Sequence, residues 1–217
     1  MEVLPVGPEA LLVDLEGLPD VLGAVAAVGA ALRDALERGE LPGVVDVVPA
    51  ARTVLVTAPG AREALRGVRS LLAGVDTTAV PDREEAGTVV LDVHYDGEDL
   101  ELVARDAGCS IDEVVSMHTG ATLTVAFGGF APGFAYLAGL PEPLQQPRLD
   151  TPRPRIPTGA VGVAGEFGGV YPRTSPGGWR LIGRLTDDAP TLFDPDRDPP
   201  ALLQPGTTVR FRDAGPA

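Results

Sequence analysis

Apolar residues in the first eighty positions follow two spacings, one typical of strands and one typical of helices. Residues 10–15 form a short apolar run that predicts a strand. From Leu18 to Leu36, apolar residues recur every three or four positions, which predicts an amphipathic helix that opens at Pro19 and ends at Gly39. Two β-branched runs in a hairpin-like arrangement and a second helix follow, at residues 44–48, 53–57 and 61–73. This part of the chain predicts a small two-layer α/β domain.

A polar stretch at residues 77–87 separates this domain from the rest of the chain. It contains Pro81 and the charge run at 82–85, which are typical of a linker. We therefore predict two domains, residues 1–84 and residues 85–217. Two strands with two helical segments between them are predicted next, at residues 88–93, 100–108, 110–118 and 122–127. Ser110 and Glu113 have the spacing of a capping box at the start of the second of these helices.

The amino-acid composition changes at residues 128–183, which contain 12 Gly and 9 Pro. This density excludes long helices and predicts short strands and tight turns, closed or nearly closed into a β-barrel. Residues 127–193 also contain 8 of the 10 aromatic residues, which supply too much apolar area for a disordered segment. The predicted fold class is α+β, with a two-layer α/β domain followed by a barrel domain.

Composition excludes several classes of function. All 17 basic residues are Arg, so a Walker-type phosphate loop and a Schiff-base mechanism, which both need Lys, are excluded. The two His and the single Cys show no short spacing that would indicate a metal site. A formal charge of -14 opposes binding to nucleic acid. With one Cys, no basic leader and no apolar run long enough to span a bilayer, we expect a cytoplasmic protein without disulfides or membrane segments.

Charge is distributed unevenly, and residues 148–184 form a positive island in an acidic chain. This stretch carries six Arg but only Asp150 and Glu166 as acids. Arg presents a planar, charged fork that binds carboxylate or phosphate groups in a bidentate manner, so the island suggests a small anionic ligand. The alternative is that individual arginines pair with acidic residues from neighbouring segments.

Several motifs of the second half resemble one family. They include Gly129-Phe-Ala-Pro-Gly-Phe-Ala-Tyr-Leu137, Pro147-Arg148, Thr151-Pro-Arg153, Val161-Gly-Val-Ala-Gly165, Ser175-Pro-Gly-Gly-Trp179 and Leu192-Phe-Asp-Pro195. Their order and spacing, from Asp99 to Phe211, closely resemble the B subunit of the bacterial ATP-dependent 5-oxoprolinase. This family is also called allophanate hydrolase subunit 1 and includes the inhibitor of a sporulation histidine kinase. The first half of the chain agrees with the family in length and element order.

The resemblance implies a cyclophilin-like barrel and a hydrolase that acts as a hetero-oligomer. With a homologous C-type subunit and a third, A-type subunit, it would cleave the lactam 5-oxo-L-proline to L-glutamate. The cofactor implied is ATP with magnesium, bound either by this chain or by the assembled complex, and the chain alone would be inactive. Two alternatives stay open. One is a regulatory protein that inhibits a sensor histidine kinase, and the other is a component of a biotin-dependent carboxyltransferase of the allophanate or urea type.

The motifs and the island nominate three groups of site residues. His118 is the candidate catalytic residue, as general base or hydrogen-bond partner, and the alternative is a helix-terminal residue that makes a local hydrogen bond or lies at the subunit interface. The candidates for binding a substrate or another anion are Arg148, Arg153, Arg155, Gly177, Gly178 and Arg184. The candidates for lining a pocket are Phe130, Tyr136, Glu166, Tyr171 and Trp179, with a place in the barrel core as the alternative for the aromatic residues. Glu166 stands where many members of the family have a polar amide, a departure that points to a different substrate.

Overall fold

The computed structural model describes residues 1–79 and 87–216. The chain forms two compact units, and the division between them falls within residues 80–86. The predicted boundary between residues 84 and 85, and the charge run at 82–85, therefore lie outside the described residues. Each unit has its own cluster of buried aliphatic side chains.

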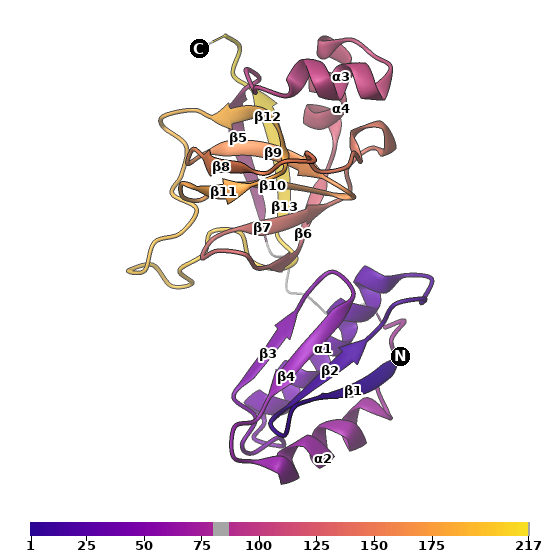
Figure 1. Cartoon of the computed structure of the whole chain (residues 1–217). Coiled ribbons are helices and arrows are strands. Elements are labelled where there is room, and N and C mark those ends of the chain that lie inside the picture. Colours follow the sequence, from indigo (N-terminus) through magenta and orange to yellow (C-terminus); the bar gives the residue numbers. More distant parts are fainter. Residues whose placement is uncertain (80–86, 217) are drawn as a thin grey trace. The chain divides into compact units, whose positions relative to one another are not determined.

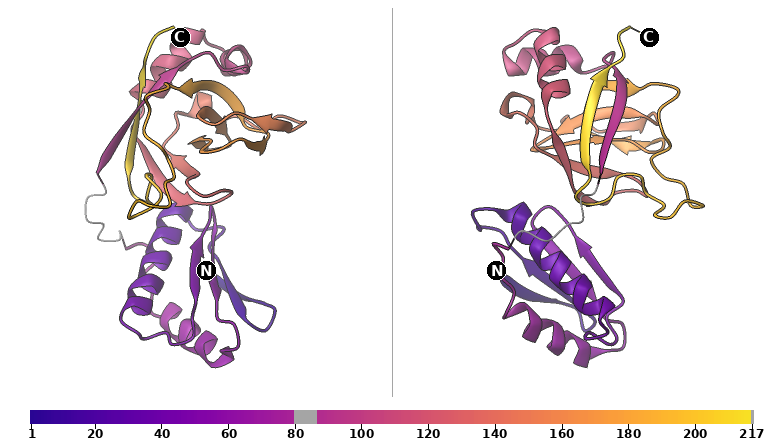
Figure 2. Two further views of the ribbon diagram at one scale, coloured as in Figure 1. Left: turned by 90° about the vertical axis from the view of Figure 1, so that its left-hand side faces the viewer. Right: turned by 180° about the vertical axis from the view of Figure 1, so that it is seen from behind.

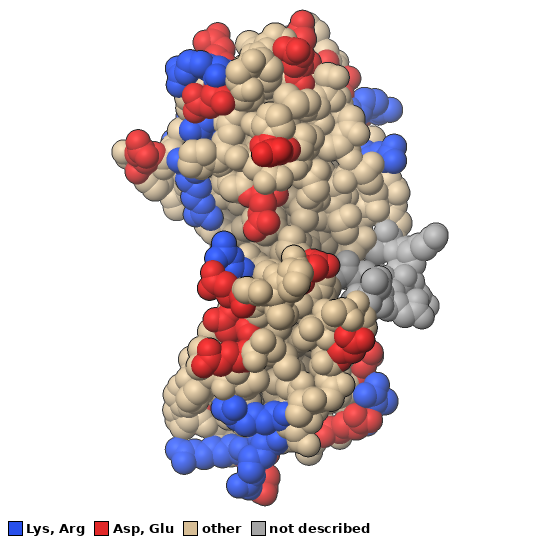
Figure 3. Space-filling view, turned by 90° about the vertical axis from the view of Figure 1, so that its right-hand side faces the viewer, with Lys and Arg blue, Asp and Glu red and all other residues tan. Residues whose placement is uncertain are grey.

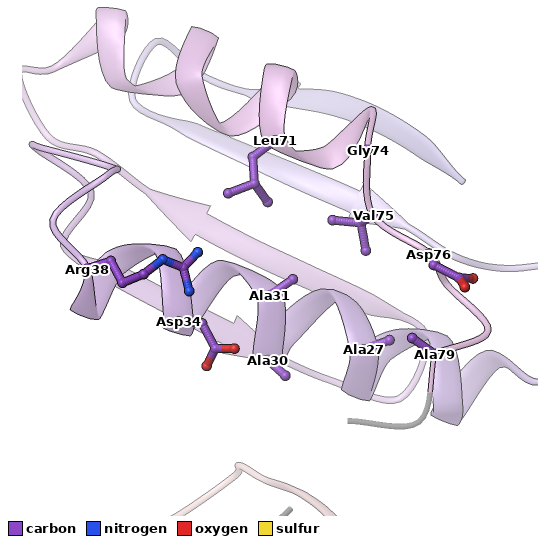
Figure 4. A pocket seen from close by; sticks show the side chains of 10 residues that line it. All are labelled: Ala27, Ala30, Ala31, Asp34, Arg38, Leu71, Gly74, Val75, Asp76 and Ala79. Carbon is purple, nitrogen blue, oxygen red and sulfur yellow. The ribbon is translucent and has the colours of Figure 1, made fainter. Parts of the chain in front are cut away.

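The first unit is a four-stranded antiparallel sheet with two helices on one face (Figures 1 and 4). Its strands lie in the order β1-β2-β4-β3. The elements are β1 (Glu2–Val6), β2 (Ala10–Asp14), α1 (Val21–Glu37), β3 (Asp46–Pro49), β4 (Thr53–Thr57) and α2 (Arg62–Leu72). The prediction of a small two-layer α/β fold is confirmed.

Buried apolar residues at every second position of β2 and β4 determine which face of the sheet the helices cover. Leu11 and Val13 of β2 are buried, and they pair in register with Val56 and Val54 of β4, which are also buried. Successive strand side chains point to opposite faces, so these four residues share the face that packs against the helices. Asp20 caps α1 by accepting a hydrogen bond from the Gly23 backbone N–H at 2.8 Å.

The second unit is a closed seven-stranded barrel, with strands in the order β10-β7-β6-β13-β5-β12-β9 (Figures 1 and 2). These strands are β5 (Thr88–His94), β6 (Leu123–Gly128), β7 (Ala135–Ala138), β9 (Ala160–Ala164), β10 (Phe167–Val170), β12 (Arg180–Leu185) and β13 (Thr208–Asp213). β5 and β13, the first and last strands of the unit, pair in parallel. The predicted class, an α/β part followed by a β-barrel, is confirmed.

Three further elements lie beside the barrel strands. β8 (Arg153–Ile156) and β11 (Ser175–Gly177) form a separate two-stranded antiparallel sheet, which we call the β8–β11 layer. α3 (Leu100–Ala107) contacts β12, and α4 (Ile111–Gly120) contacts β13. The predicted capping box at the start of α4 is confirmed, because the Ser110 hydroxyl accepts from the Glu113 backbone N–H while the Glu113 carboxylate accepts from that of Ser110. A short 3₁₀ turn, η1, covers Glu142–Leu144.

Among the helices of the described residues, none combines the length and the apolar character needed to cross a bilayer.

Candidate functional site

The six arginines of the positive island divide into a paired half and an unpaired half. Three of them form ion pairs with acidic residues that lie more than fifty positions earlier in the chain: Arg153 with Glu98 and Asp99, Arg180 with Asp106, and Arg184 with Asp96. These acids stand immediately before α3 or within it. Half of the island therefore neutralises acids just before α3 and in its last turn.

Arg153 is part of a largely buried ion pair. Its Nη2 donates to Oδ1 of Asp99 at 2.8 Å, and the exposed fractions of the two side chains are 21% and 8%. The second oxygen of Asp99 accepts from the Leu181 backbone N–H at 2.8 Å. The hydrogen bond with Asp99 raises the pKa of Arg153, so the guanidinium remains charged. This candidate anion-binding residue is thus already engaged with a carboxylate of its own chain.

Arg180, which was not among the sequence-based candidates, is a buried charged residue of the barrel. Its Nη1 donates to Oδ2 of Asp106 at 2.7 Å and to the side-chain oxygen of Gln146. Gln146 in turn donates to the Val103 backbone carbonyl at 2.9 Å. The hydrogen bond from Arg180 holds the pKa of Asp106 below its ordinary value. The only sequence signal for this residue was its membership of the island.

Arg148, Arg155 and Arg173 form the unpaired half. All three are exposed, and they make no ion pair or side-chain hydrogen bond within residues 1–79 and 87–216. Arg155 lies on β8, and Arg173 precedes β11 by two positions. The segment that carries Arg148 is attached to the same layer, because the Leu149 backbone N–H donates to the Gly178 carbonyl at 2.8 Å. These three residues place positive charge without an ion-pair partner at the β8–β11 layer.

Gly177 brings this layer close to a buried tyrosine. A Cβ atom at position 177 would lie 2.5 Å from the Tyr171 hydroxyl and 2.8 Å from Cδ1 of Ile156, so only glycine allows the approach. Burial raises the pKa of the Tyr171 hydroxyl, and the nearby charges of Arg148 and Arg153 partly oppose this effect. The predicted residues Gly177, Gly178, Arg148 and Tyr171 therefore lie in one neighbourhood.

The predicted aromatic residues form a contact cluster with three further rings. Ring centroids of neighbouring members are 4.3–6.2 Å apart, mostly in edge-to-face geometry. We call this set the aromatic cluster, and its members are Phe127, Phe130, Phe134, Tyr136, Phe167, Tyr171 and Trp179. It is distinct from the aliphatic cluster of the barrel, whose one aromatic member is Phe211. Tyr171 and Trp179 are buried, whereas Phe130 is 57% exposed.

Glu166, predicted to line a pocket, is exposed in the turn between β9 and β10, and makes no ion pair within the described residues.

Acidic and basic side chains are interspersed over the face drawn in Figure 3, with uncharged surface between them.

His118 lies fully buried in α4, and its aromatic contacts are with Tyr95 and Phe211. Its Nδ1 is 2.7 Å from the Tyr95 hydroxyl, and its ring stacks on Phe211 with centroids 4.4 Å apart. Its Nε2 has no hydrogen-bond partner within the described residues. Burial lowers the pKa of His118 from 6.5 to about 3, so the imidazole is neutral at physiological pH. This placement favours a structural role inside the barrel unit, which is neither of the two alternatives predicted, over direct contact with a substrate.

Three hollows are lined by other residues. One of about 440 Å³ lies between α1 and the end of α2 with the segment that follows it, where Ala27, Ala31, Leu71 and Val75 face one another (Figure 4). A second, of about 510 Å³, includes Asp92, His94 and Arg212, and a third, of about 250 Å³, includes Cys109 and Met117. Within residues 1–79 and 87–216, no group of three or more His, Cys, Asp or Glu side chains could hold a metal ion.

Comparison with known proteins identifies the family. The family model of the carboxyltransferase domain, subdomain C and D, matches residues 1–203. The chain belongs to this family.

Curated relatives are named as the B subunit of 5-oxoprolinase. That of Escherichia coli O157:H7 is 50% identical over 115 residues, which are 53% of this chain and 51% of the relative. That of Bacillus subtilis (strain 168) is 45% identical over 126 residues, which are 57% of this chain and 51% of the relative. The match thus spans about half the length of these curated relatives.

Solved structures share the fold of this carboxyltransferase-family chain. TTHA0988 is 36% identical with a TM-score of 0.76, over 94% of this chain and 40% of that one. The conserved uncharacterized protein PH0987 from Pyrococcus horikoshii is 31% identical with a TM-score of 0.56, over 99% and 98%. The K. lactis urea amidolyase is 18% identical with a TM-score of 0.76, over 98% of this chain and 15% of that one, a likeness of fold alone.

Proposed function

We propose that this chain is one component of an ATP-dependent 5-oxoprolinase that, with partner subunits, hydrolyses 5-oxo-L-proline to L-glutamate. The observation that carries the proposal is the 50% identity over 115 residues with a protein named as the B subunit of 5-oxoprolinase. That name supports an enzyme of several subunits, and we propose a C-type subunit together with an A-type subunit as the partners.

The unpaired arginines support the proposal of an anionic ligand at the β8–β11 layer. The substrate carries a carboxylate, and phosphorylation of its lactam carbonyl by ATP would make that carbon a better electrophile for water. Arg148 and Arg155 offer guanidinium forks for either the carboxylate or the developing charge on oxygen. Arg153 and Arg184 already serve carboxylates of this chain, so their proposed role is to hold β8 and β12 against the segment before α3.

Nucleotide and magnesium are assigned to the complex rather than to this chain alone. Mg²⁺ prefers carboxylate oxygens and phosphate, and the described residues include no group of three acids or histidines that could hold it. The three unpaired arginines fit a phosphate or a carboxylate without a metal. We therefore expect the chain to be inactive until partner subunits complete the site.

The test is reconstitution of the chain with C-type and A-type subunits, with glutamate measured in the presence and absence of ATP. Glutamate is expected only with all subunits and ATP. Arg148→Ala and Arg155→Ala should each lower kcat/KM at least tenfold, because a charge-assisted contact to substrate is lost. Arg210→Ala, which removes an exposed arginine of β13 outside the island, is the matched control and should leave kcat/KM within twofold.

Two outcomes would contradict the proposal. Vigorous hydrolysis by the isolated chain would refute its dependence on partners. No glutamate from the full set of subunits, together with inhibition of a sensor histidine kinase by the chain, would establish the regulatory alternative instead.

A further inference from the structure

Phe130 is an exposed aromatic residue in a strained backbone conformation. Its φ is +64°, the one positive value among non-glycine residues in the described parts of the chain, and 57% of its surface is free. The Ala131 backbone N–H donates to the Gly129 carbonyl at 2.6 Å, which closes a three-residue turn with Phe130 at its centre. A γ-turn with positive φ at the central residue is rare and strained, and such strain persists only where the surroundings impose it.

The rest of the loop holds this turn in place. The Phe134 N–H donates to the Ala131 carbonyl at 3.0 Å, and the Gly129 N–H donates to the Phe134 carbonyl at 3.2 Å. Gly133 has φ +80°, and a Cβ atom there would lie 2.6 Å from Cβ of Phe193. These contacts pin both ends of the turn, so the Phe130 ring is presented in a fixed direction.

Two buried rings support Phe130 from within the aromatic cluster. Its ring meets those of Phe134 and Tyr171 edge to face, with centroids 5.3 and 6.2 Å apart. A preorganised side chain loses little conformational entropy when its exposed part is covered. Because 57% of the Phe130 residue is exposed, the described residues supply no outer wall around it, as a small-molecule pocket would require. A second protein surface fits the observation better.

The surroundings of Phe130 define the character of that surface. Tyr171, whose ring meets that of Phe130, lies against Gly177 of the β8–β11 layer. At this layer Arg148, Arg155 and Arg173 are exposed and have no ion pair within the described residues. Buried aromatic anchors bordered by charged residues are typical of the sites that dominate protein interfaces. Arg148 and Arg155 face the substrate in the proposed function, so charge complementarity with a partner requires an acidic residue opposite Arg173.

We propose that Phe130 is the anchor of a protein interface, inserting its ring into an apolar pocket of a partner subunit whose border carries a carboxylate that pairs with Arg173. This inference rests on the proposed function, in which the partner is the C-type subunit. It adds the residue that docks and the chemistry of the surface that receives it.

The test uses isothermal titration calorimetry to measure the Kd of the chain for the purified C-type subunit. Phe130→Ala removes the ring but keeps the strained turn, whereas Phe130→Gly removes the ring and accepts positive φ without strain. Both variants should bind at least tenfold more weakly, and Phe130→Gly should have a Tm no lower than the wild type. Val90→Ala, at a residue of β5 that is 48% exposed, is the matched control and should change Kd less than twofold.

Salt separates the contribution of Arg173 from that of the ring. Wild-type affinity should fall with ionic strength, and Arg173→Ala should make that dependence shallower. Phe130→Gly should leave the slope unchanged, because it removes no charge.

Other outcomes overturn the inference, and they differ from those that would refute the enzyme. Unchanged Kd in a stable Phe130→Gly variant refutes the anchor, as does failure of the wild-type chain to bind the C-type subunit. Unchanged Kd with a raised KM for 5-oxoproline would place the ring against a small ligand instead. If Phe130→Gly weakens binding tenfold but the wild-type complex forms no glutamate, the anchor stands and the oxoprolinase proposal fails.

Discussion

The environment of His118 decides which protonation state this residue can adopt. Its ring is enclosed between Phe211 and the Tyr95 hydroxyl, with no carboxylate of the described residues in hydrogen-bond contact with it. Desolvation opposes the charged imidazolium, so the pKa falls to about 3 in the folded protein from an ordinary value of 6.5. The sequence alone predicted two roles, because helical spacing places a residue on a face but does not say whether water reaches it.

The buried imidazole predicts a particular dependence of stability on pH. Below pH 6.5 the His118 side chain binds a proton in the unfolded chain but stays neutral in the folded protein. Its contribution therefore lowers the free energy of unfolding by about 1.4 kcal/mol for each unit that the pH falls. His118→Asn should be destabilised by about 1–3 kcal/mol at pH 8 through lost packing. That deficit should shrink by about 2 kcal/mol between pH 7 and pH 5. Urea unfolding of both proteins at a series of pH values measures it.

The same variant tests the catalytic prediction for His118. If the residue only packs, turnover of the reconstituted enzyme per folded subunit should stay within tenfold of the wild type at pH 8. A loss of a hundredfold or more in a folded variant would restore its role as general base. A deficit that does not change with pH would contradict the neutral, buried state.

At the scale of elements, ion pairs connect the β8–β11 layer and β12 to α3 and to the residues just before it. Asp99 receives hydrogen bonds from Arg153 of β8 and from the Leu181 backbone of β12. Removing Arg153 would leave a buried carboxylate with one fewer donor, whereas removing Arg148 would leave no charge unpaired.

This difference predicts opposite effects on stability for two arginines of the same island. Arg153→Ala should lower the free energy of unfolding by about 2–3 kcal/mol at pH 7, because it leaves the buried Asp99 carboxylate without its cationic partner. Arg148→Ala, an exposed residue without an ion pair in the described parts of the chain, should change it by less than about 0.5 kcal/mol. Urea denaturation of the two variants beside the wild type is the measurement, and equal stabilities would contradict the structural role given to Arg153.

Local patterns predicted the elements better than their contacts. Periodicity predicted α1, α2 and the paired strands β3 and β4, because amphipathic spacing is a property of neighbouring residues. It missed β1, whose five residues include Pro5 and whose place is fixed by pairing with β2. The pairs between arginines of the island and acids near α3 span 54–88 positions, so no local pattern could reveal them. For the same reason the sequence could not tell anion-binding arginines from structural ones.

At the scale of the whole molecule, two separate cores and one barrel closure determine what can fold alone. The aliphatic clusters of the two units share no residue. In the second unit, β13 pairs with β5 from Thr208–Thr88 to Asp213–Val93 and also with β6, and its Val209 and Phe211 are core residues. The last strand of the chain therefore closes a barrel that the first strand of the unit begins.

This arrangement predicts the behaviour of three fragments. Residues 1–79 and residues 87–217, expressed separately, should each unfold cooperatively in urea, because each retains a complete core. Residues 87–207 lack β13, which exposes the ladder groups of β5 and β6 and removes two buried side chains, so this fragment should show no cooperative transition. Circular dichroism during urea titration distinguishes the three. A folded 87–207 fragment would show that closure by β13 is dispensable, and an unfolded 87–217 fragment would show that the barrel depends on the first unit.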